Sequence, residues 1–259
     1  MFPICGRKEE KKNLMIKRTK YQGVLNIVRF NWPFYVTGLL VVIGLYAVAF
    51  ITFQPFMVLF PFAILVGMLI SLLVSWYVYD LSGIYRLKWL DGLKGKVLNI
   101  NAGFDETTTL VRERFPNIEL DVADFYDEKR MTEASIRRAR EAYPLEKEAK
   151  QVDIGKLDVA NDYDKVLLFF AVHEIRNEND RIKFFKELNR VINNEGEVYI
   201  VEHLRDWKNF IAYTIGFFHF YSRKTWMLAF EQADFNFKEE IKLTPFVSLF
   251  KIGKNGITS

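Results

Sequence analysis

Hydrophobic and polar positions divide the chain into two unlike parts. Residues 30–79 contain no Asp, Glu, Lys, Arg or His. Apolar runs cover residues 32–53 and 56–79, and each is long enough for a helix that crosses a hydrocarbon layer of ~30 Å, which takes about 20 residues. Gln54 and Pro55 separate the runs, and proline breaks a helix. The pattern therefore predicts a hairpin of two transmembrane helices.

From residue 94 onward, short apolar runs alternate with amphipathic ones. We expect strands at residues 96–101, 117–122, 151–154, 165–171 and 197–201, helices at 105–115, 131–143, 179–191 and 222–233, and a closing strand pair at 235–243 and 246–251. The run at 165–171 is apolar throughout, as in a strand that is buried on both faces of a parallel sheet. The alternation predicts an α/β fold with a doubly wound, mostly parallel sheet.

Charge follows the same division. The whole chain carries a net charge of +4, but the residues before the apolar block include eight basic and only two acidic side chains. Basic residues flank both outer ends of the block and none lies in its connecting turn, so the positive-inside rule puts both termini in the cytoplasm. We therefore expect a multi-pass membrane protein with a basic cytoplasmic leader (1–29), a transmembrane pair (30–80), a linker (81–93) and a Rossmann-like domain (94–259).

Other interpretations of the N-terminal part stay open. One is a buried helical hairpin in a soluble core, although such long uncharged stretches are rare there. Another is a cleaved signal peptide, because Ala47-Val48-Ala49 has the small-x-small form of a cleavage site. The leader is compatible with a helix on an anionic membrane surface and with a solvated flank. The single cysteine, Cys5, excludes a disulfide framework.

Over roughly residues 93–251, the order of strands and turns resembles the class I S-adenosylmethionine-dependent methyltransferases. In that family the first strand runs into a glycine-rich turn that approaches the cofactor. The corresponding positions here are Asn99, Asn101 and Gly103, of which only the glycine matches. The resemblance implies a Rossmann-like methyltransferase fold with an antiparallel last strand, S-adenosylmethionine as the cofactor, and methyl transfer as the reaction.

The resemblance also implies roles for acidic residues after the second and third strands. A carboxylate that ends the second strand would accept hydrogen bonds from the cofactor ribose, and Asp124 takes that place. Asp121 and Asp127 are alternatives if the strand register is shifted. Asp153 takes the place near the adenine.

All three histidines lie in the second half of the chain. His173 follows the fourth predicted strand, His203 follows the fifth, and His219 lies in the segment after it, while Glu174 and Glu202 adjoin two of them. Ligands bind at the carboxyl ends of parallel strands, and histidine is a base that titrates near neutral pH. We expect these five residues to form the catalytic site. The alternative is a structural role for each histidine, and no metal site is expected because the spacings match no standard zinc pattern.

Aromatic residues gather between residues 204 and 226. This segment follows the fifth strand and contains Trp207, Phe210, Tyr213, Phe217, Phe218, Phe220, Tyr221 and Trp226. We favour a lid that faces the membrane or an apolar acceptor over simple core packing. Arg205 and Arg223 are candidates for holding an anionic head group, with solvated surface arginines as the alternative.

The sequence therefore predicts a membrane-anchored methyltransferase whose acceptor is lipid-like or membrane-resident, such as a quinone precursor, a phospholipid or an isoprenoid. One alternative is a non-catalytic methyltransferase-like membrane scaffold that has lost its cofactor. Another is a nicotinamide-dependent enzyme, although its glycine fingerprint is absent. A nucleic-acid partner is not expected, because Arg137, Arg138 and Arg140 read as a solvated helix face in a net acidic domain.

Overall fold

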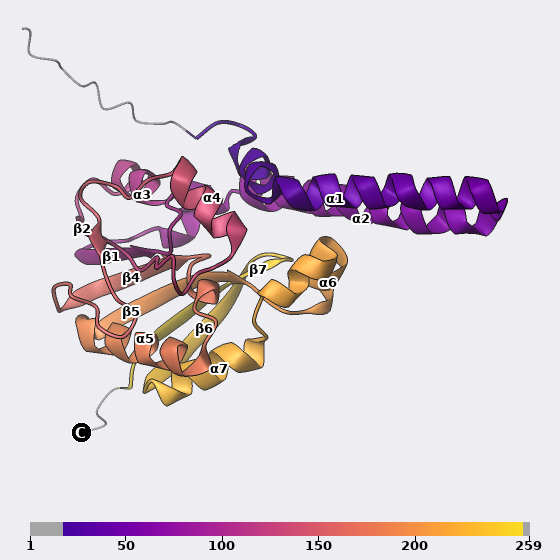
Figure 1. The fold of residues 1–259 in the computed structure, drawn as a ribbon. Coiled ribbons are helices and arrows are strands. Elements are labelled where there is room, and N and C mark those ends of the chain that lie inside the picture. The colour runs from indigo at the N-terminus through magenta and orange to yellow at the C-terminus, as the bar shows by residue number, and fades with distance from the viewer. Residues whose placement is uncertain (1–17, 256–259) are drawn as a thin grey trace, which may run out of the picture.

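The computed structural model describes residues 18–255, which form an α/β domain and a long helical pair (Figure 1). The pair consists of α1 (Gln22–Thr52) and α2 (Leu59–Trp76), joined through a short 3₁₀ turn at Pro55–Val58. The two helices contact each other and run side by side away from the domain. Two helices therefore stand where the two apolar runs predict them.

Seven strands form a single sheet in the order β3-β2-β1-β4-β5-β7-β6. The strands are β1 (Lys96–Asn101), β2 (Glu119–Asp124), β3 (Lys150–Gln151), β4 (Tyr163–Phe169), β5 (Ile192–His203), β6 (Phe235–Thr244) and β7 (Val247–Lys254). The first five are parallel, and β7 is antiparallel to both of its neighbours, β5 and β6. The predicted mostly parallel sheet with an antiparallel last strand is confirmed.

The sheet is buried on both faces. Leu98 and Ile100 of β1 belong to one apolar cluster, whereas Val97 belongs to the cluster on the opposite face, as the alternation of side chains along a strand requires. The first cluster includes residues of α5 (Glu178–Val191) and α7 (Arg223–Gln232), where the rings of Phe185 and Phe230 lie 5.1 Å apart. The remaining helices are α3 (Thr108–Arg114), α4 (Ala134–Ala142) and α6 (Trp207–Tyr213).

The segment predicted as a linker packs against the sheet. Ile84, Leu87 and Leu90 are almost fully buried and join the second apolar cluster. Ile84 and Leu90 lie on two short 3₁₀ turns, Ile84–Arg86 and Lys88–Leu90, and Leu87 lies between the turns. The helical pair is thus joined to the domain through a buried segment.

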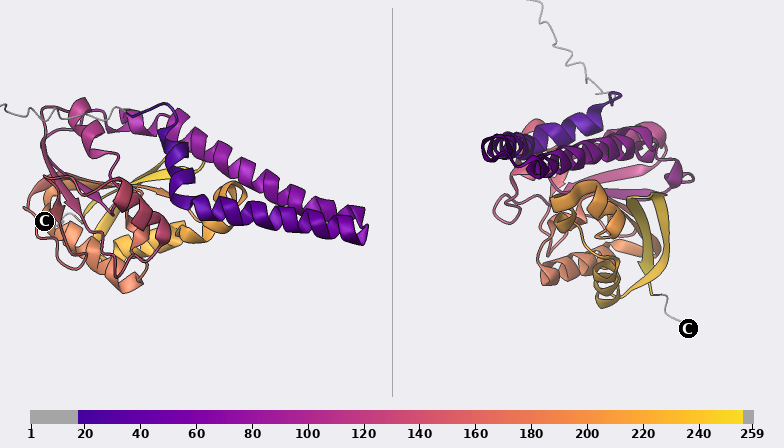
Figure 2. Two further views of the ribbon diagram at one scale, coloured as in Figure 1. Left: turned by 45° about the horizontal axis from the view of Figure 1, so that its top comes forward. Right: turned by 90° about the vertical axis from the view of Figure 1, so that its right-hand side faces the viewer.

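Helix α1 bends near its start. Asn31 has non-helical backbone angles, and Pro33 follows two residues later. Proline has no N–H, so the helical hydrogen bond to the carbonyl of Arg29 is lost, and a bend results. The guanidinium of Arg138 on α4 donates to the neighbouring carbonyl of Phe30 at 2.6 Å. Residues before the bend lie on the α/β domain, and the rest of the helix leads away from it (Figure 2).

The beginning of α1 is fixed by Asp80 at the end of the second apolar run. The Asp80 carboxylate accepts hydrogen bonds from the backbone N–H groups of Gly23 (2.8 Å) and Val24 (2.9 Å). A carboxylate at this end favours the helix because unpaired N–H groups and the positive end of the helix dipole meet there. A Cβ at Gly23 would lie only 2.4 Å from the Cβ of Tyr79, so the close approach requires glycine.

The same stretch also contacts the turn after β1. The side chains of Gln22 and Asn26 both donate to Glu106 at 2.9 Å, and the rings of Phe30 and Phe104 meet edge to face at 5.3 Å. The part of the predicted leader that the structure describes therefore binds the α/β domain. Residues 1–17, for which a membrane-surface helix or a solvated flank is predicted, lie outside the described residues.

The helical pair is long and apolar enough to cross a membrane and is mostly exposed. Within the most apolar 18-residue windows, only 11% of residues in the first helix and 6% in the second are buried. The alternative of a hairpin buried in a soluble core is therefore wrong. Ala47-Val48-Ala49 lies within the continuous helix α1.

Candidate functional site

The carboxyl ends of the parallel strands bring the predicted site residues to one edge of the sheet. Ile100 of β1 pairs with Leu168 of β4, and Phe169 of β4 pairs with Val201 of β5. Directly after β4, Phe170 has a φ of +47°, which is a strained conformation for a residue with a side chain. This turn leads the chain into a short 3₁₀ segment, Val172–Glu174. Ligands of open α/β sheets bind at this edge.

His173 lies between two carboxylates. Glu202, on β5 and fully buried, faces Nδ1 of His173 at 2.7 Å and accepts a hydrogen bond from its backbone N–H at 3.2 Å. On the other side, Nε2 lies 3.5 Å from Oε1 of Glu174. Burial disfavours the charged imidazolium, but the two carboxylates outweigh that effect and raise the pKa of His173 to about 10.

His219 completes the group from the other side of Glu174. The rings of His173 and His219 are 4.8 Å apart, and Nε2 of His219 lies 3.7 Å from Oε1 of Glu174. Burial would raise the pKa of Glu174, but the two histidine rings beside it lower it well below its usual range. The side chain of His219 is 26% exposed, so the group opens to solvent. The structure thus brings together four of the five predicted catalytic residues, including Glu202.

Two residues that the sequence did not indicate belong to this group. Glu133, just before α4, places Oε1 3.1 Å from Nδ1 of His219. Arg176 donates to Glu133 at 2.6 Å and to the His219 carbonyl at 2.7 Å, and its guanidinium also contacts the His219 ring. Both lie in connecting segments far from His219 in the sequence, and no motif links them to it.

His203 has a different environment from the other histidines. Its Nδ1 lies 3.0 Å from the carbonyl of Phe246, which can only accept, so Nδ1 carries the proton and Nε2 accepts from the Tyr79 hydroxyl at 2.9 Å. The ring is 2% exposed and stacks on Phe170 and Phe220. Burial lowers the pKa of His203 to about 3. These contacts correspond to the structural role, in which His203 connects the base of the helical pair to the sheet.

The three predicted cofactor residues in and before the turn after β1 have different environments. Asn99 is fully buried, and its Nδ2 donates to the hydroxyls of Thr107 (3.0 Å) and Thr108 (2.8 Å), so it positions the start of α3. Asn101 is buried at the end of β1. Gly103 has a φ of +92°, and a Cβ there would lie 2.7 Å from the ring of Tyr126. Only Gly103 therefore provides the close backbone approach expected of the family's turn.

Asp124 ends β2 beside this glycine. One carboxylate oxygen accepts hydrogen bonds from the N–H groups of Gly103 (3.1 Å) and Tyr126 (2.8 Å), and the other forms an ion pair with Arg140 at 2.6 Å. Burial raises the pKa of Asp124, although Tyr126 N–H and Arg140 oppose that effect. Gly103 and Asp124 fit the adenosyl end of S-adenosylmethionine in kind and position, but a ribose would have to share the carboxylate with Arg140.

Two arginines of α4 therefore depart from the predicted solvated face. Arg140 pairs with Asp124, and Arg138 bonds the bent part of α1. Arg205 and Arg223, which were candidates for an anionic head group, are also engaged. Arg205 donates to backbone carbonyls of its own aromatic segment, and Arg223 pairs with Glu240 at 2.6 Å.

Asp153 lies at the rim of this edge. Its side chain is 55% exposed, lies 3.3 Å from Arg130, and lines a surface hollow of about 560 Å³ together with Asp127 and residues after β2. Asp121, in contrast, is occupied by a 2.6 Å hydrogen bond from the Tyr163 hydroxyl.

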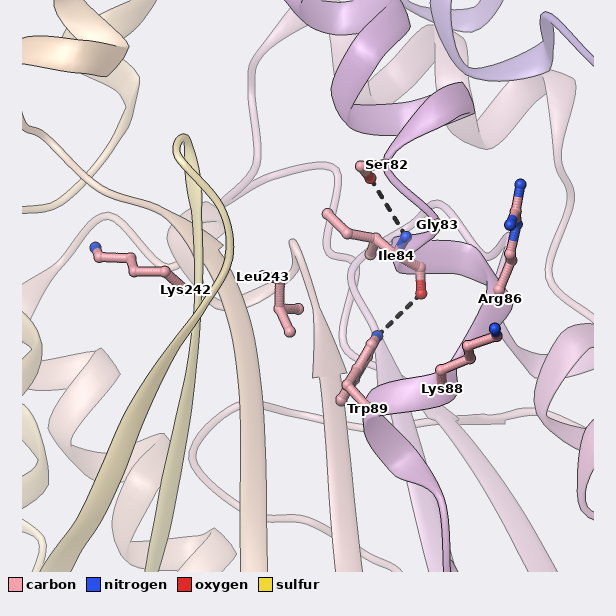
Figure 3. Close-up of a pocket in the computed structure, with 8 residues that line it drawn as sticks. All are labelled: Ser82, Gly83, Ile84, Arg86, Lys88, Trp89, Lys242 and Leu243. Carbon is pink, nitrogen blue, oxygen red and sulfur yellow. Dashed lines mark hydrogen bonds between the residues drawn. The ribbon is translucent and has the colours of Figure 1, made fainter.

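A second hollow of about 400 Å³ lies elsewhere, lined by Ser82, Gly83, Ile84, Arg86, Lys88, Trp89, Lys242 and Leu243, and contains none of the predicted site residues (Figure 3).

Comparisons with known proteins bear on the fold alone. No family model matches the chain, and no curated protein matches it. Among solved structures, an S-adenosylmethionine-dependent methyltransferase from Clostridium acetobutylicum is 8% identical, with 67% of this chain and 91% of that chain covered and a TM-score of 0.46. A Pyrococcus horikoshii protein is 16% identical, with 67% and 88% covered and a TM-score of 0.49. An O-methyltransferase family 2 protein from Planctomyces limnophilus is 14% identical, with 73% and 62% covered and a TM-score of 0.49.

Proposed function

We propose that this chain is a membrane-anchored S-adenosylmethionine-dependent methyltransferase that acts on a lipid-like acceptor. One observation carries the proposal: the same edge of the sheet holds a turn suited to an adenosyl group, at Gly103 and Asp124, and a polar group suited to an acceptor, at His173, Glu174 and His219. The neighbouring strands β1 and β4 lead into these two sites.

Each part of the edge has a task in this reaction. S-adenosylmethionine would supply an electrophilic methyl group, and the protein mainly has to align the acceptor with it. His173 is held between Glu202 and Glu174, so its ring is fixed in a position suited to orienting the acceptor. His219, partly exposed and supported by Glu133 at Nδ1, is better placed to take a proton from a hydroxyl acceptor.

The surface next to His219 supports an apolar acceptor. The chain from α6 to His219 exposes five large apolar side chains, which we call the α6 patch: Trp207, Phe210, Ile211, Ile215 and Phe218. Helix α6 contacts α2 and lies beside the base of the helical pair (Figures 1 and 2). An apolar surface of this kind, continuous with two apolar helices, suits contact with a bilayer, and the segment ends at the polar group.

Cofactor binding is the first test. The protein, purified in detergent, is titrated calorimetrically with S-adenosylmethionine, beside Asp124→Asn and the control Asp158→Asn, whose side chain is 79% exposed. Loss of charge-assisted hydrogen bonds to a ribose should weaken binding about 10- to 100-fold in Asp124→Asn and leave the control unchanged. A tritiated methyl donor incubated with the protein and a total lipid extract should then label the organic phase.

A non-catalytic scaffold is the second candidate, favoured by the Arg140–Asp124 ion pair and by the Tyr126 ring against Gly103. The same titration decides between the two. No heat of binding at millimolar S-adenosylmethionine would reject the enzyme and support the scaffold.

A further inference from the structure

His173 and His219 both direct the same ring nitrogen, Nε2, toward the carboxylate of Glu174. Nδ1 of His173 faces Glu202 at 2.7 Å, and Nδ1 of His219 faces Glu133 at 3.1 Å. With both Nδ1 atoms occupied in this way, both Nε2 atoms turn toward Oε1 of Glu174, at 3.5 Å and 3.7 Å. The arrangement therefore offers two imidazole nitrogens and one carboxylate oxygen around a common point.

The spacing of these atoms suits a metal ion better than direct hydrogen bonds. Strong N–H···O hydrogen bonds have donor–acceptor distances of about 2.7–3.2 Å, and both Nε2···Oε1 distances are longer. Two ligands that each lie about 2.0–2.1 Å from a tetrahedral zinc ion are about 3.3 Å apart. All three candidate ligand atoms lie within 4.8 Å of one another. We propose that His173, Glu174 and His219 bind one divalent transition-metal ion.

The surroundings of the three ligands support this assignment. Metal-binding histidines usually donate their second ring nitrogen to a carboxylate, which fixes the ring and strengthens the ligand. Glu202 and Glu133 stand in that position for the two histidines. Glu202 is fully buried and Glu174 is 8% exposed, so two carboxylates sit at the inner side of the group. A divalent cation would balance this negative charge.

Arg176 is the group that a metal ion would displace. Its guanidinium lies 3.0 Å from Nε2 of His219, a position that is incompatible with a cation bound to that nitrogen. Its side chain is 37% exposed, donates to Glu133 and to the His219 carbonyl, and lies over the ring of Tyr221, so metal binding at Nε2 requires the guanidinium to move away from the His219 ring.

Two histidines and one carboxylate leave coordination positions open. This ligand set is found with catalytic zinc and with non-haem iron(II). An open position at the partly exposed His219 side would hold an oxygen atom of a substrate and lower the pKa of a bound hydroxyl or water. The inference does not depend on S-adenosylmethionine, because the ligands form a site whether or not the turn at Gly103 binds a cofactor.

Metal content and affinity test the proposal directly. The full chain, purified in detergent without chelator and without a histidine tag, should contain about one zinc or iron ion per chain by elemental analysis, and the analysis identifies which. After treatment with a chelator, it should bind added Zn²⁺ in calorimetry and give the visible absorption of a tetrahedral site with Co²⁺. Magnesium, which prefers oxygen ligands, should bind far more weakly.

Three variants and a control make the result specific. His173→Gln and His219→Gln should lose the Co²⁺ spectrum, and Glu202→Gln should weaken Zn²⁺ binding about 10- to 100-fold. Glu239→Gln, on an exposed strand position, is the control and should bind as the unaltered chain does. Unfolding temperatures in excess chelator identify any variant that is misfolded, and Glu174→Gln then replaces it. A chain with no bound ion and with the same Zn²⁺ isotherm as the His173→Gln, His219→Gln double variant would overturn the proposal.

Discussion

Asp124 is the residue at which the two candidate functions separate. Its carboxylate is 2% exposed and is stabilised by two backbone N–H groups and by Arg140. Because burial raises its pKa, the ionised form depends on these donors. The acid that would bind a ribose is thus also one half of an internal ion pair.

Removing Arg140 should destabilise the protein in a pH-dependent way. In Arg140→Gln the folded pKa of Asp124 should rise further. A carboxyl group whose folded pKa lies above its unfolded pKa stabilises the folded protein at low pH, and this stabilisation is lost as the pH rises through the folded pKa. We expect a loss of about 2 kcal/mol at pH 8, below the cost at a fully buried pair because Arg140 is 18% exposed, and a clearly smaller loss at pH 5. Thermal unfolding in detergent between pH 5 and 8 measures this dependence.

The matched control is the double variant Arg140→Gln, Asp124→Asn, which has no carboxyl group at this position. Its stability relative to the single variant Asp124→Asn should not change with pH over the same range, because neither chain has the carboxyl group. An Arg140→Gln penalty that is equal at pH 5 and pH 8 would show that the ion pair does not control the protonation of Asp124.

Part of the candidate site could be predicted from the sequence, and the rest could not, for a physical reason. His173 and Glu174 follow β4 and Glu202 lies at the end of the neighbouring strand β5, so strand order alone places them at one edge. Glu133 and Arg176 reach His219 only through the way the loops fold back. His203 is the last residue of β5, yet the carbonyl of Phe246 and the hydroxyl of Tyr79 direct its ring away from this group.

Among the elements, the aromatic segment 204–226 contains both buried and exposed rings, which the sequence alone did not distinguish. Trp226 and Phe220 are buried in the domain, whereas Trp207, Phe210 and Phe218 are more than half exposed. The aromatic segment therefore combines the two interpretations, core packing and an apolar surface. The bend of α1 was also missed, because Asn31 and Pro33 lie within an otherwise continuous apolar pattern.

The exposed side of α6 should lie in the bilayer. Ile211→Cys in a Cys5→Ser background carries a nitroxide label, and the protein is reconstituted into lipid nanodiscs. Because oxygen concentrates in hydrocarbon and charged nickel chelates stay in water, the label should collide more often with oxygen, as measured by electron paramagnetic resonance. Ile211 is 54% exposed, so the label should not disturb the fold.

Lys183→Cys on α5 provides the matched site, with a side chain that is 65% exposed and lies outside the α6 patch. There the nickel chelate should be the more effective relaxing agent. Equal behaviour of the two labelled sites would show that α6 faces water, and the proposed route for a lipid-like acceptor would lose its support.

For the whole molecule, the contacts between the helical pair and the domain fix their relative orientation. Asp80 binds the start of α1, Glu106 binds Gln22 and Asn26, and Tyr79 binds His203. The bend in α1 and the buried segment after α2 act together with these contacts. A membrane-spanning pair would therefore hold the α/β domain in one orientation at the bilayer, with helix α6 against α2 on the side of the helical pair (Figure 1).

The distribution of charge predicts on which side of the membrane the α/β domain lies. Basic residues flank the outer ends of the pair and are absent from the turn at Gln54, so the turn should cross to the outside, and both termini should stay in the cytoplasm. Cys5 is the only cysteine and serves as a natural reporter for the N-terminal side. In intact cells, a membrane-impermeant maleimide should not label Cys5 until the membrane is permeabilised.

In a Cys5→Ser background, Gln54→Cys should show the opposite behaviour and react in intact cells. Phe53 next to it is 84% exposed, so the turn is accessible to the reagent. Ser222→Cys, at the start of α7 in the α/β domain, should behave like Cys5 because it lies on the cytoplasmic side. Labelling of Ser222→Cys in intact cells would place the domain outside, where cytoplasmic S-adenosylmethionine does not reach it, and would reject the proposed reaction together with the topology.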